Sequence, residues 1–240
     1  MNNYKTDKLF EAIGIGFPSD KESLEAFDKS FEGYTFEADV NNIDPLKILN
    51  RIKNSTVTNI DYHKRTVLAA EIVSKLYSER TLGHLKLHKL LYLCQHTTKM
   101  NLHTNFLKQA MGPYDPNLMR SIDTQFKRNK WFSYNSNDLC KYQPLENSGN
   151  HKEWFLKYFN EDKDDIEFLI EKFRKFKSDQ IEIVATIFAC WKDAIEKKQM
   201  VNDELIIYKF YDWSENKKKY DKDRIKRAIK WMEMEGIYPS

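Results

Sequence analysis

The segment Leu85–Cys94, LKLHKLLYLC, constrains the fold more than any other part of the chain. Its apolar side chains recur at the spacing of one helical face: Leu87, Leu90, Leu91 and Cys94. This periodicity predicts an amphipathic helix whose apolar stripe packs on a core. Lys86, Lys89 and Gln95 fall on the other side, so we expect them to face solvent.

A Gly-Pro pair follows this helix and predicts a fixed turn. Gly112 tolerates unusual backbone angles, and Pro113 disfavours the helical region at Gly112. Asp115 is the expected N-cap of a further helix, with Pro116 at its first position and Asn129 near its end. Four residues supply its expected buried face: Leu118, Met119, Ile122 and Phe126.

The composition favours a mainly α fold. The 240 residues are 41% hydrophobic and 31% charged, as in globular proteins, and only seven are Gly and six Pro. We expect a multi-helix body, a small β-hairpin formed by Trp131–Tyr134 and Leu139–Gln143, and a C-terminal unit with a helix-turn-helix outline. No apolar run is long enough to cross a bilayer, and the N-terminus lacks a signal-peptide pattern. Three widely spaced cysteines indicate buried thiols in a cytoplasmic protein.

Charge and pattern divide the chain into three expected parts. Residues 1–55 form an acidic helical appendage, 56–160 the helical body, and 161–240 a helical unit that ends in a basic helix. Residues 1–45 carry ten acidic and four basic side chains, a balance of −6, so the remaining 195 carry +9 to give the net +3. The acidic segment either folds back on the basic body or meets a basic partner, and fold-back is the simpler alternative.

Capping signals place the C-terminal helices. Ser178 or Asp179 is expected to cap one helix, Asn202 the next and Asp221 the last, with Gly236 as its terminator. A helix that opens with the acidic residues near Asp164 precedes them, since carboxylates suit the positive end of a helix dipole.

The sequence offers little for catalysis. His84 and His88 are four residues apart, a spacing that can place two imidazoles on one metal ion, but no third ligand or general base accompanies them. There is no nucleophile elbow and no Gly-rich phosphate loop. We therefore expect no catalytic residue, no metal and no cofactor. A metal-assisted hydrolase around the two histidines is the least favoured alternative.

The basic C-terminal segment is the best nucleic-acid signal. Lys222, Lys226 and Lys230 are four residues apart and form a ridge opposite Ile225 and Ile229. Such a ridge can neutralise phosphates without reading sequence. The candidate DNA-binding residues are Lys217, Lys218, Lys222, Lys226, Arg227 and Lys230. The alternative is a solvated helix face.

The Leu85–Cys94 helix and the Gly-Pro pair together resemble the core of the Panacea antitoxin domain. The matching residues are Lys86, Leu87, Lys89, Leu90, Leu91 and Tyr92, then Gly112 and Pro113. The resemblance implies a non-enzymatic protein that binds a cognate toxin, with this helix and the Gly-Pro turn as a stable platform and the N-terminal appendage as the partner-contacting part. Because aromatic anchors dominate interface energies, Phe10, Phe17, Phe27 and Phe31 are candidate partner-binding residues. The other candidates are Gly112, Pro113 and Tyr114 of the Gly-Pro segment.

The second half also resembles accessory C-terminal regions of some type I restriction-modification specificity subunits. The likeness rests on Glu182–Thr186, Trp191, Trp213-Ser214, Lys217-Lys218, Trp231-Met232, Gly236 and Pro239. The expected function is therefore that of a toxin-antitoxin or phage-defence accessory protein that binds and regulates a partner protein. The alternative is a DNA-binding regulator or restriction-modification subunit that uses the basic last helix. The sequence does not fix the oligomeric state.

Overall fold

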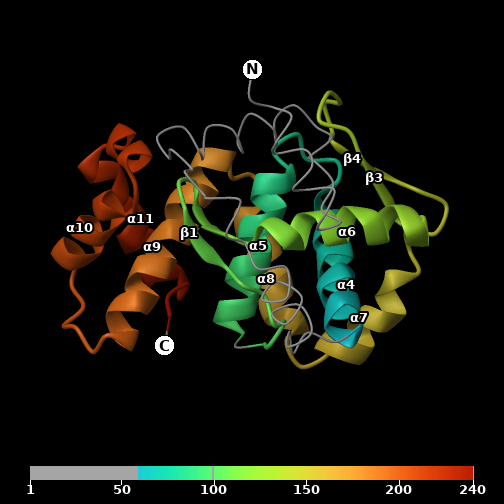
Figure 1. Cartoon of the computed structure of the whole chain (residues 1–240), viewed down its shortest axis with the longest axis horizontal. Coiled ribbons are helices and arrows are strands. Elements are labelled where there is room, and N and C mark those ends of the chain that lie inside the picture. Colours follow the sequence, from blue (N-terminus) through green and yellow to red (C-terminus); the bar gives the residue numbers. More distant parts are fainter. Residues whose placement is uncertain (1–58, 99, 240) are drawn as a thin grey trace, which may run out of the picture. The chain divides into compact units, whose positions relative to one another are not determined.

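The computed structural model describes residues 59–98 and 100–239, and these ranges are mainly helical (Figure 1). The helices are α4 (Asn59–Leu76), α5 (His84–Thr97), α6 (Pro116–Asn129), α7 (His151–Phe159), α8 (Lys163–Phe173), α9 (Ser178–Glu196), α10 (Asp203–Trp213), the 3-10 helix η2 (Glu215–Lys219) and α11 (Lys222–Glu235). The predicted mainly α fold is confirmed.

Helix α5 lies at the centre, where it packs against α4, α8 and α9 (Figure 1). Every residue from Lys86 to Cys94 is buried, so the helix has no solvent-facing side along these turns. The expectation that Lys86 and Lys89 face solvent is therefore wrong: both side chains are fully buried. Gln95, one residue beyond this stretch, is half-buried.

Two short hairpins complete the described part. Strands β1 (Leu107–Gln109) and β2 (Gly112–Tyr114) pair antiparallel, with Gln109 opposite Gly112. The Gly-Pro pair is consequently not the turn that the sequence predicted. It begins β2, and the reversal falls at Ala110 and Met111, directly before Gly112, whose φ is +92°.

The second hairpin confirms the prediction in outline. Strand β3 (Phe132–Tyr134) pairs with β4 (Tyr142–Pro144), which begins three residues later and ends one residue later than the expected second strand. Leu139 lies in the connecting loop and is 63% exposed.

Side-chain caps set the ends of several helices. The Asp115 carboxylate accepts from Asn117 N at the start of α6, Asn202 accepts from Leu205 N in α10, and Asp221 caps α11, all as predicted. Gly236 ends α11 with φ +70°. The predicted cap of α9 was wrong: its N-cap is Lys177, because the Gln180 side chain accepts from the Lys177 backbone N–H and replaces a hydroxyl or carboxylate cap.

One hydrophobic core crosses the expected boundary at residue 160. It joins side chains of α4, α5 and α6 to those of α8, α9, α10 and α11. The C-terminal helices are thus not a unit with a core of their own, since α5 packs along α9. The expected appendage and its boundary at residue 55 lie outside the described residues.

The C-terminal helices depart from a simple helix-turn-helix. Helices α10 and α11 are joined through η2, whereas that motif has a turn of about three to four residues. In Figure 1 these helices lie at one end of the described part, and α7 and the β3–β4 hairpin lie at the other. Among the described helices, none combines the length and the apolar character needed to span a bilayer.

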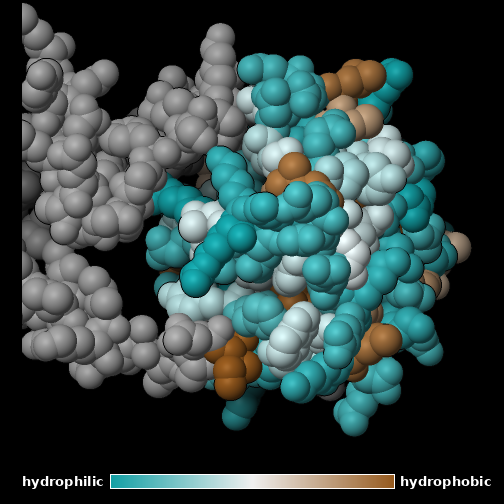
Figure 2. Space-filling view, turned by 90° about the vertical axis from the view of Figure 1, so that its right-hand side faces the viewer, coloured by the Kyte–Doolittle hydropathy of each residue, from teal (hydrophilic) through white to brown (hydrophobic). Residues whose placement is uncertain are grey.

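The face at the β3–β4 end is mostly hydrophilic. Figure 2 shows apolar residues there as separated spots among polar ones. Scattered exposed apolar side chains are normal for globular proteins, so this face does not present a continuous apolar docking surface.

Candidate functional site

The polar residues of α5 form the centre of the candidate site, although they lie in the core. Lys86 Nζ donates to Thr81 Oγ1 at 2.8 Å, to Arg174 O at 2.8 Å and to Phe176 O at 2.9 Å. Two of these acceptors are backbone carbonyls just beyond the C-terminal end of α8. Burial lowers the pKa of Lys86 to about 8, partly opposed by Glu79. The lysine thus holds the end of α8 against α5.

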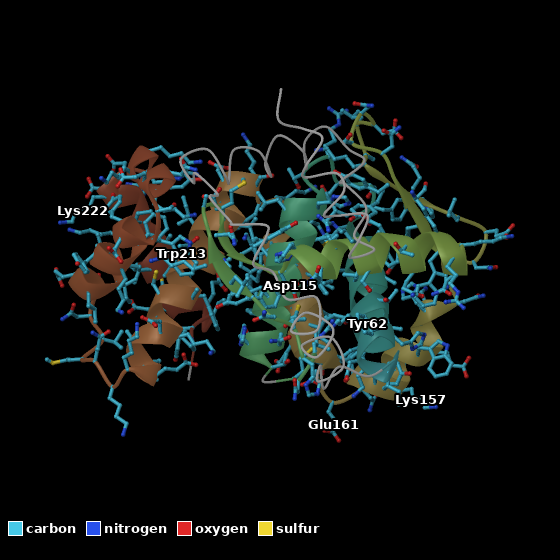
Figure 3. The ribbon with its side chains drawn as sticks, in the orientation of Figure 1. Tyr62, Asp115, Lys157, Glu161, Trp213 and Lys222 are labelled. Atoms are coloured by element: carbon cyan, nitrogen blue, oxygen red, sulfur yellow. The ribbon has the colours of Figure 1, made fainter. Side chains whose placement is uncertain are left out.

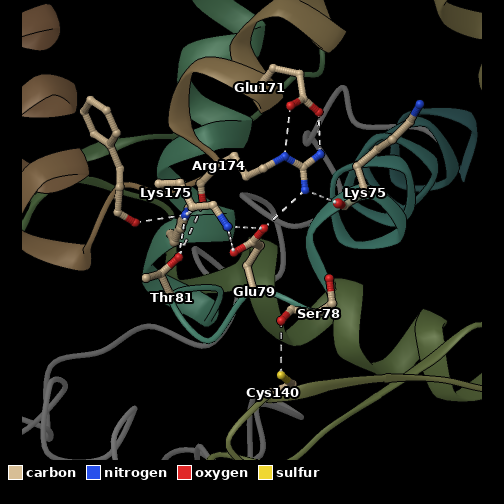
Figure 4. Close-up of polar contacts among 10 residues, drawn as sticks. Lys75, Ser78, Glu79, Thr81, Cys140, Glu171, Arg174 and Lys175 are labelled. Atoms are coloured by element: carbon tan, nitrogen blue, oxygen red, sulfur yellow. Dashed lines mark hydrogen bonds and ion pairs between the residues drawn. The ribbon is translucent and has the colours of Figure 1, made fainter.

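An ion-pair network surrounds this contact (Figure 4). The Arg174 guanidinium reaches Glu171, the Lys75 carbonyl at 2.8 Å and Glu79 at 3.5 Å. Lys175 also pairs with Glu79, at 2.9 Å. The hydrogen bond from Lys175, ahead of that from Arg174, lowers the pKa of Glu79. The network ties the end of α4 to the end of α8.

The second buried lysine, Lys89, holds the Gly-Pro strand. Its Nζ lies 2.6 Å from Pro113 O, and it forms no ion pair with a carboxylate of the described residues. Burial, together with the nearby charge of Lys217, lowers the pKa of Lys89 to about 7, against an opposing effect of Glu182. This amine therefore titrates close to neutral pH.

A buried ion pair lies next to Lys89. Lys217 Nζ on η2 is 2.6 Å from Glu182 Oε1 on α9, and the two side chains are 0% and 2% exposed. The charge of Glu182 also acts to raise the pKa of Lys89, although these two side chains form no ion pair. The arrangement connects α5, α9 and η2.

Close packing fixes β2 against α9. A Cβ on Gly112 would lie 2.6 Å from Thr186 Oγ1 and 3.5 Å from Lys89 Nζ. Only glycine fits this position, for steric reasons and because of the positive φ.

The outer side of the β1–β2 hairpin is held by the last residue of α10 and the residue after it. Trp213 Nε1 donates to Gln109 O at 2.7 Å, and Ser214 Oγ donates to Ala110 O at 3.1 Å. Figure 3 shows Trp213 between the hairpin and the C-terminal helices. The hairpin is therefore clamped between α5 and α9 on one side and the α10–η2 junction on the other.

His88 has a structural partner in the main chain. The Asp115 backbone N–H donates to His88 Nε2 at 2.9 Å, and the imidazole stacks on Tyr114 with 4.4 Å between ring centroids. Burial, together with Lys89, lowers the pKa of His88 well below its usual value, so the ring is neutral. His88 fixes the entry to α6.

The two histidines of the least favoured alternative, a metal-assisted hydrolase, each have another partner. His84 Nε2 lies 2.9 Å from Asp123 Oδ2 on α6, and the His84 ring stacks on Tyr134. His88 accepts a hydrogen bond from the Asp115 backbone N–H. Within residues 59–98 and 100–239 no group of three or more His, Cys, Asp or Glu is arranged to hold a metal ion.

The predicted partner-binding residues differ in burial, and some lie outside the described residues. Gly112 and Pro113 are buried, so they cannot serve as surface contacts; they are structural because Lys89 and Thr186 cover them. Tyr114 is half-buried. The four aromatic anchors lie outside the described residues: Phe10, Phe17, Phe27 and Phe31.

The prediction is also wrong for one of the candidate DNA-binding residues. Lys217 is fully buried in its ion pair with Glu182 and cannot contact a phosphate at the surface. The remaining candidates are exposed: Lys218, Lys222, Lys226, Arg227 and Lys230.

Sequence reasoning missed the interior roles of Lys86, Lys89 and Glu182. A signal for α5 was available, since Leu85 and Leu93 lie off the stripe through Leu87 and Leu91. Apolar residues on several faces are typical of a helix buried all round, in which any lysine must be internal.

A scan of protein-family models finds no match to this chain, and no curated protein matches it.

Proposed function

We propose that this chain is a non-enzymatic bacterial regulator that acts by binding a partner protein, as an antitoxin or phage-defence accessory protein does. The proposal rests on one observation: the polar side chains of the α5 motif are engaged in contacts that stabilise the fold. Lys86, His88 and Lys89 are buried, and each is bonded to backbone atoms of a neighbouring segment.

This arrangement favours a binding platform over a reaction centre. A catalytic acid, base or nucleophile has to reach its substrate, whereas these three side chains face carbonyl oxygens or a backbone N–H in the core. The lysines instead make the β1–β2 hairpin and the end of α8 rigid. A rigid scaffold lowers the cost of binding, because fewer groups become ordered in the complex.

The setting we propose is the cytoplasm. The three cysteines are free, and Cys94 and Cys190 are buried. Burial raises the pKa of both thiols to about 12. Inert thiols of this kind are typical of proteins in a reducing compartment.

Affinity purification tests the proposal. The tagged full chain is expressed in its native host, and co-purifying proteins are identified by mass spectrometry. We expect one partner at near-stoichiometric amounts, encoded beside this gene, and growth rescue when a toxic partner is co-expressed with the chain.

Two variants locate the contact. Replacing Phe10, Phe17, Phe27 and Phe31 with Ala should abolish capture, because aromatic anchors dominate interfaces. The matched control replaces exposed apolar residues elsewhere with Ala: Leu139, Met200, Tyr208 and Met234, which are 63%, 80%, 68% and 78% exposed. Recovery of no specific protein, or substrate turnover by the purified chain, contradicts the proposal.

A further inference from the structure

Helix α11 presents a row of exposed cations. It rests on α9 and α10, and its buried side chains are Ile225, Ile229 and Met232. The opposite side of the helix carries exposed basic residues, which we call the α11 lysine face: Lys222, Lys226, Arg227 and Lys230. Figure 3 shows Lys222 at the outer edge of the C-terminal helices, far from Asp115.

The charge of this face is not cancelled by ion pairs. None of its four cations pairs with a carboxylate of the described residues, whereas neighbouring charges on the same helix are paired. Arg224 pairs with Asp179, and Glu235 pairs with Lys172. Within residues 59–98 and 100–239 the face therefore keeps its positive charge, which suits an anionic ligand.

The exposed acids lie towards the two ends of α11. Asp221 accepts from the backbone N–H groups of Asp223 and Arg224, at 2.7 and 3.3 Å, and so serves as the cap. Asp223 lies in the first turn and Glu233 in the last. Between Asp223 and Glu233 the exposed charged side chains are all cations, namely Lys226, Arg227 and Lys230, whereas Lys222 lies beside the acids of the first turn.

The spacing of the lysines suits a polyanion. With a rise of about 1.5 Å per residue, consecutive lysines of the row are about 6 Å apart along the axis, and Lys222 and Lys230 about 12 Å apart. That length corresponds to about 3.5 base pairs of duplex at 3.4 Å each. We propose that the α11 lysine face binds the phosphate backbone of duplex nucleic acid.

The side-chain chemistry argues for backbone contact rather than base reading. Lysine is a flexible point charge, whereas specific base contacts use the bidentate groups of Arg, Asn or Gln. The face also carries no exposed aromatic side chain, and single-strand binders depend on stacking bases on such rings. Binding is therefore independent of the nucleotide sequence. This inference does not rest on the proposal that the chain binds a partner protein.

Fluorescence anisotropy of the full chain with a labelled duplex tests this proposal across a series of KCl concentrations. Four phosphate contacts predict a slope of about −3.6 for log K against log salt. The triple variant Lys222→Gln, Lys226→Gln, Lys230→Gln should weaken binding more than tenfold at about 0.1 M KCl and leave a slope of about −0.9. Helix content by circular dichroism should not change, since all three side chains are exposed.

The matched control removes the same charge elsewhere, through Lys127→Gln, Lys152→Gln and Lys157→Gln, all exposed on α6 and α7. It should retain the affinity and slope of the unmodified chain. Equal losses in both triple variants would assign binding to net charge and overturn the proposal. So would the absence of binding at about 100 µM protein, or tighter binding to a single strand of the same length.

Discussion

The ammonium group of Lys89 on α5 lies 2.6 Å from the carbonyl oxygen of Pro113 on β2, and the lysine side chain is fully buried. A buried amine without a carboxylate partner is costly when it is charged, since desolvation disfavours the ion. The contact positions β2, but it also makes the free energy of unfolding depend on the protonation of Lys89.

Lys89 should make stability depend on pH above neutrality. Its pKa in the folded chain is about 7, whereas an unfolded lysine has a pKa of about 10.4. Between these values the unfolded chain binds more protons, so stability rises with pH, by up to about 1.4 kcal/mol per unit from this group. Below about pH 7 both states are protonated and this contribution no longer changes.

Urea denaturation of the unmodified chain and of Lys89→Met, from about pH 7 to pH 10, measures this effect. The variant removes the amine with a side chain of similar length, so its stability should rise less steeply over that range. Near pH 7 we expect the variant to be within about 1 kcal/mol of the unmodified chain, because the lost hydrogen bond offsets the relieved desolvation. Identical pH slopes for the two proteins would contradict the assigned role.

Lys86→Met should behave differently, because Lys86 satisfies three acceptors where Lys89 satisfies one. Its loss leaves the carbonyl oxygens of Arg174 and Phe176 without this donor, at about 1–3 kcal/mol for each buried group. We expect a net loss of about 2–4 kcal/mol in urea denaturation. Lys175→Met is the control, since its side chain is 79% exposed and its surface ion pair contributes less than about 1 kcal/mol.

Local signals in the sequence predicted much of the fold. The caps Asp115, Asn202 and Asp221 were predicted correctly because each side-chain oxygen bonds backbone N–H groups within the next three residues. Such contacts depend only on neighbours in the chain.

The interior of the candidate site depends on contacts that sequence spacing does not reveal. Lys217 meets Glu182 35 positions away, and Lys86 meets Phe176 90 positions away. Charged residues are almost never fully buried unless they are paired, so the pattern placed these lysines at the surface. Their burial follows from the packing of α5 among α4, α8 and α9.

Gly112→Ala should destabilise the chain by more than about 2 kcal/mol, for two separable reasons. The added Cβ would lie 2.6 Å from Thr186 Oγ1, and the φ of +92° is unfavourable for a residue with a Cβ. Thr186→Ala removes the clashing atom, so the double variant should recover part of the loss, while the backbone strain of about 1 kcal/mol or more remains.

Denaturation of the two single variants and the double variant separates these effects. Ala110→Gly, in the adjacent turn, is the control for a general loss of hairpin order. If the double variant loses as much stability as the two single variants together, Thr186 is not the obstacle.

The pair formed by Glu182 and Lys217 should show strong coupling in a double-mutant cycle. Removing one partner leaves the other charge buried and alone, which typically costs about 3–5 kcal/mol. Glu182→Gln should be the worse single change, because it leaves Lys217 without its partner and also removes the nearby charge that favours protonated Lys89. Combining it with Lys217→Met removes both members of the pair, so the double variant should be more stable than Glu182→Gln alone. Additive losses within about 0.5 kcal/mol would mean that the 2.6 Å contact contributes no coupling to the stability of the core.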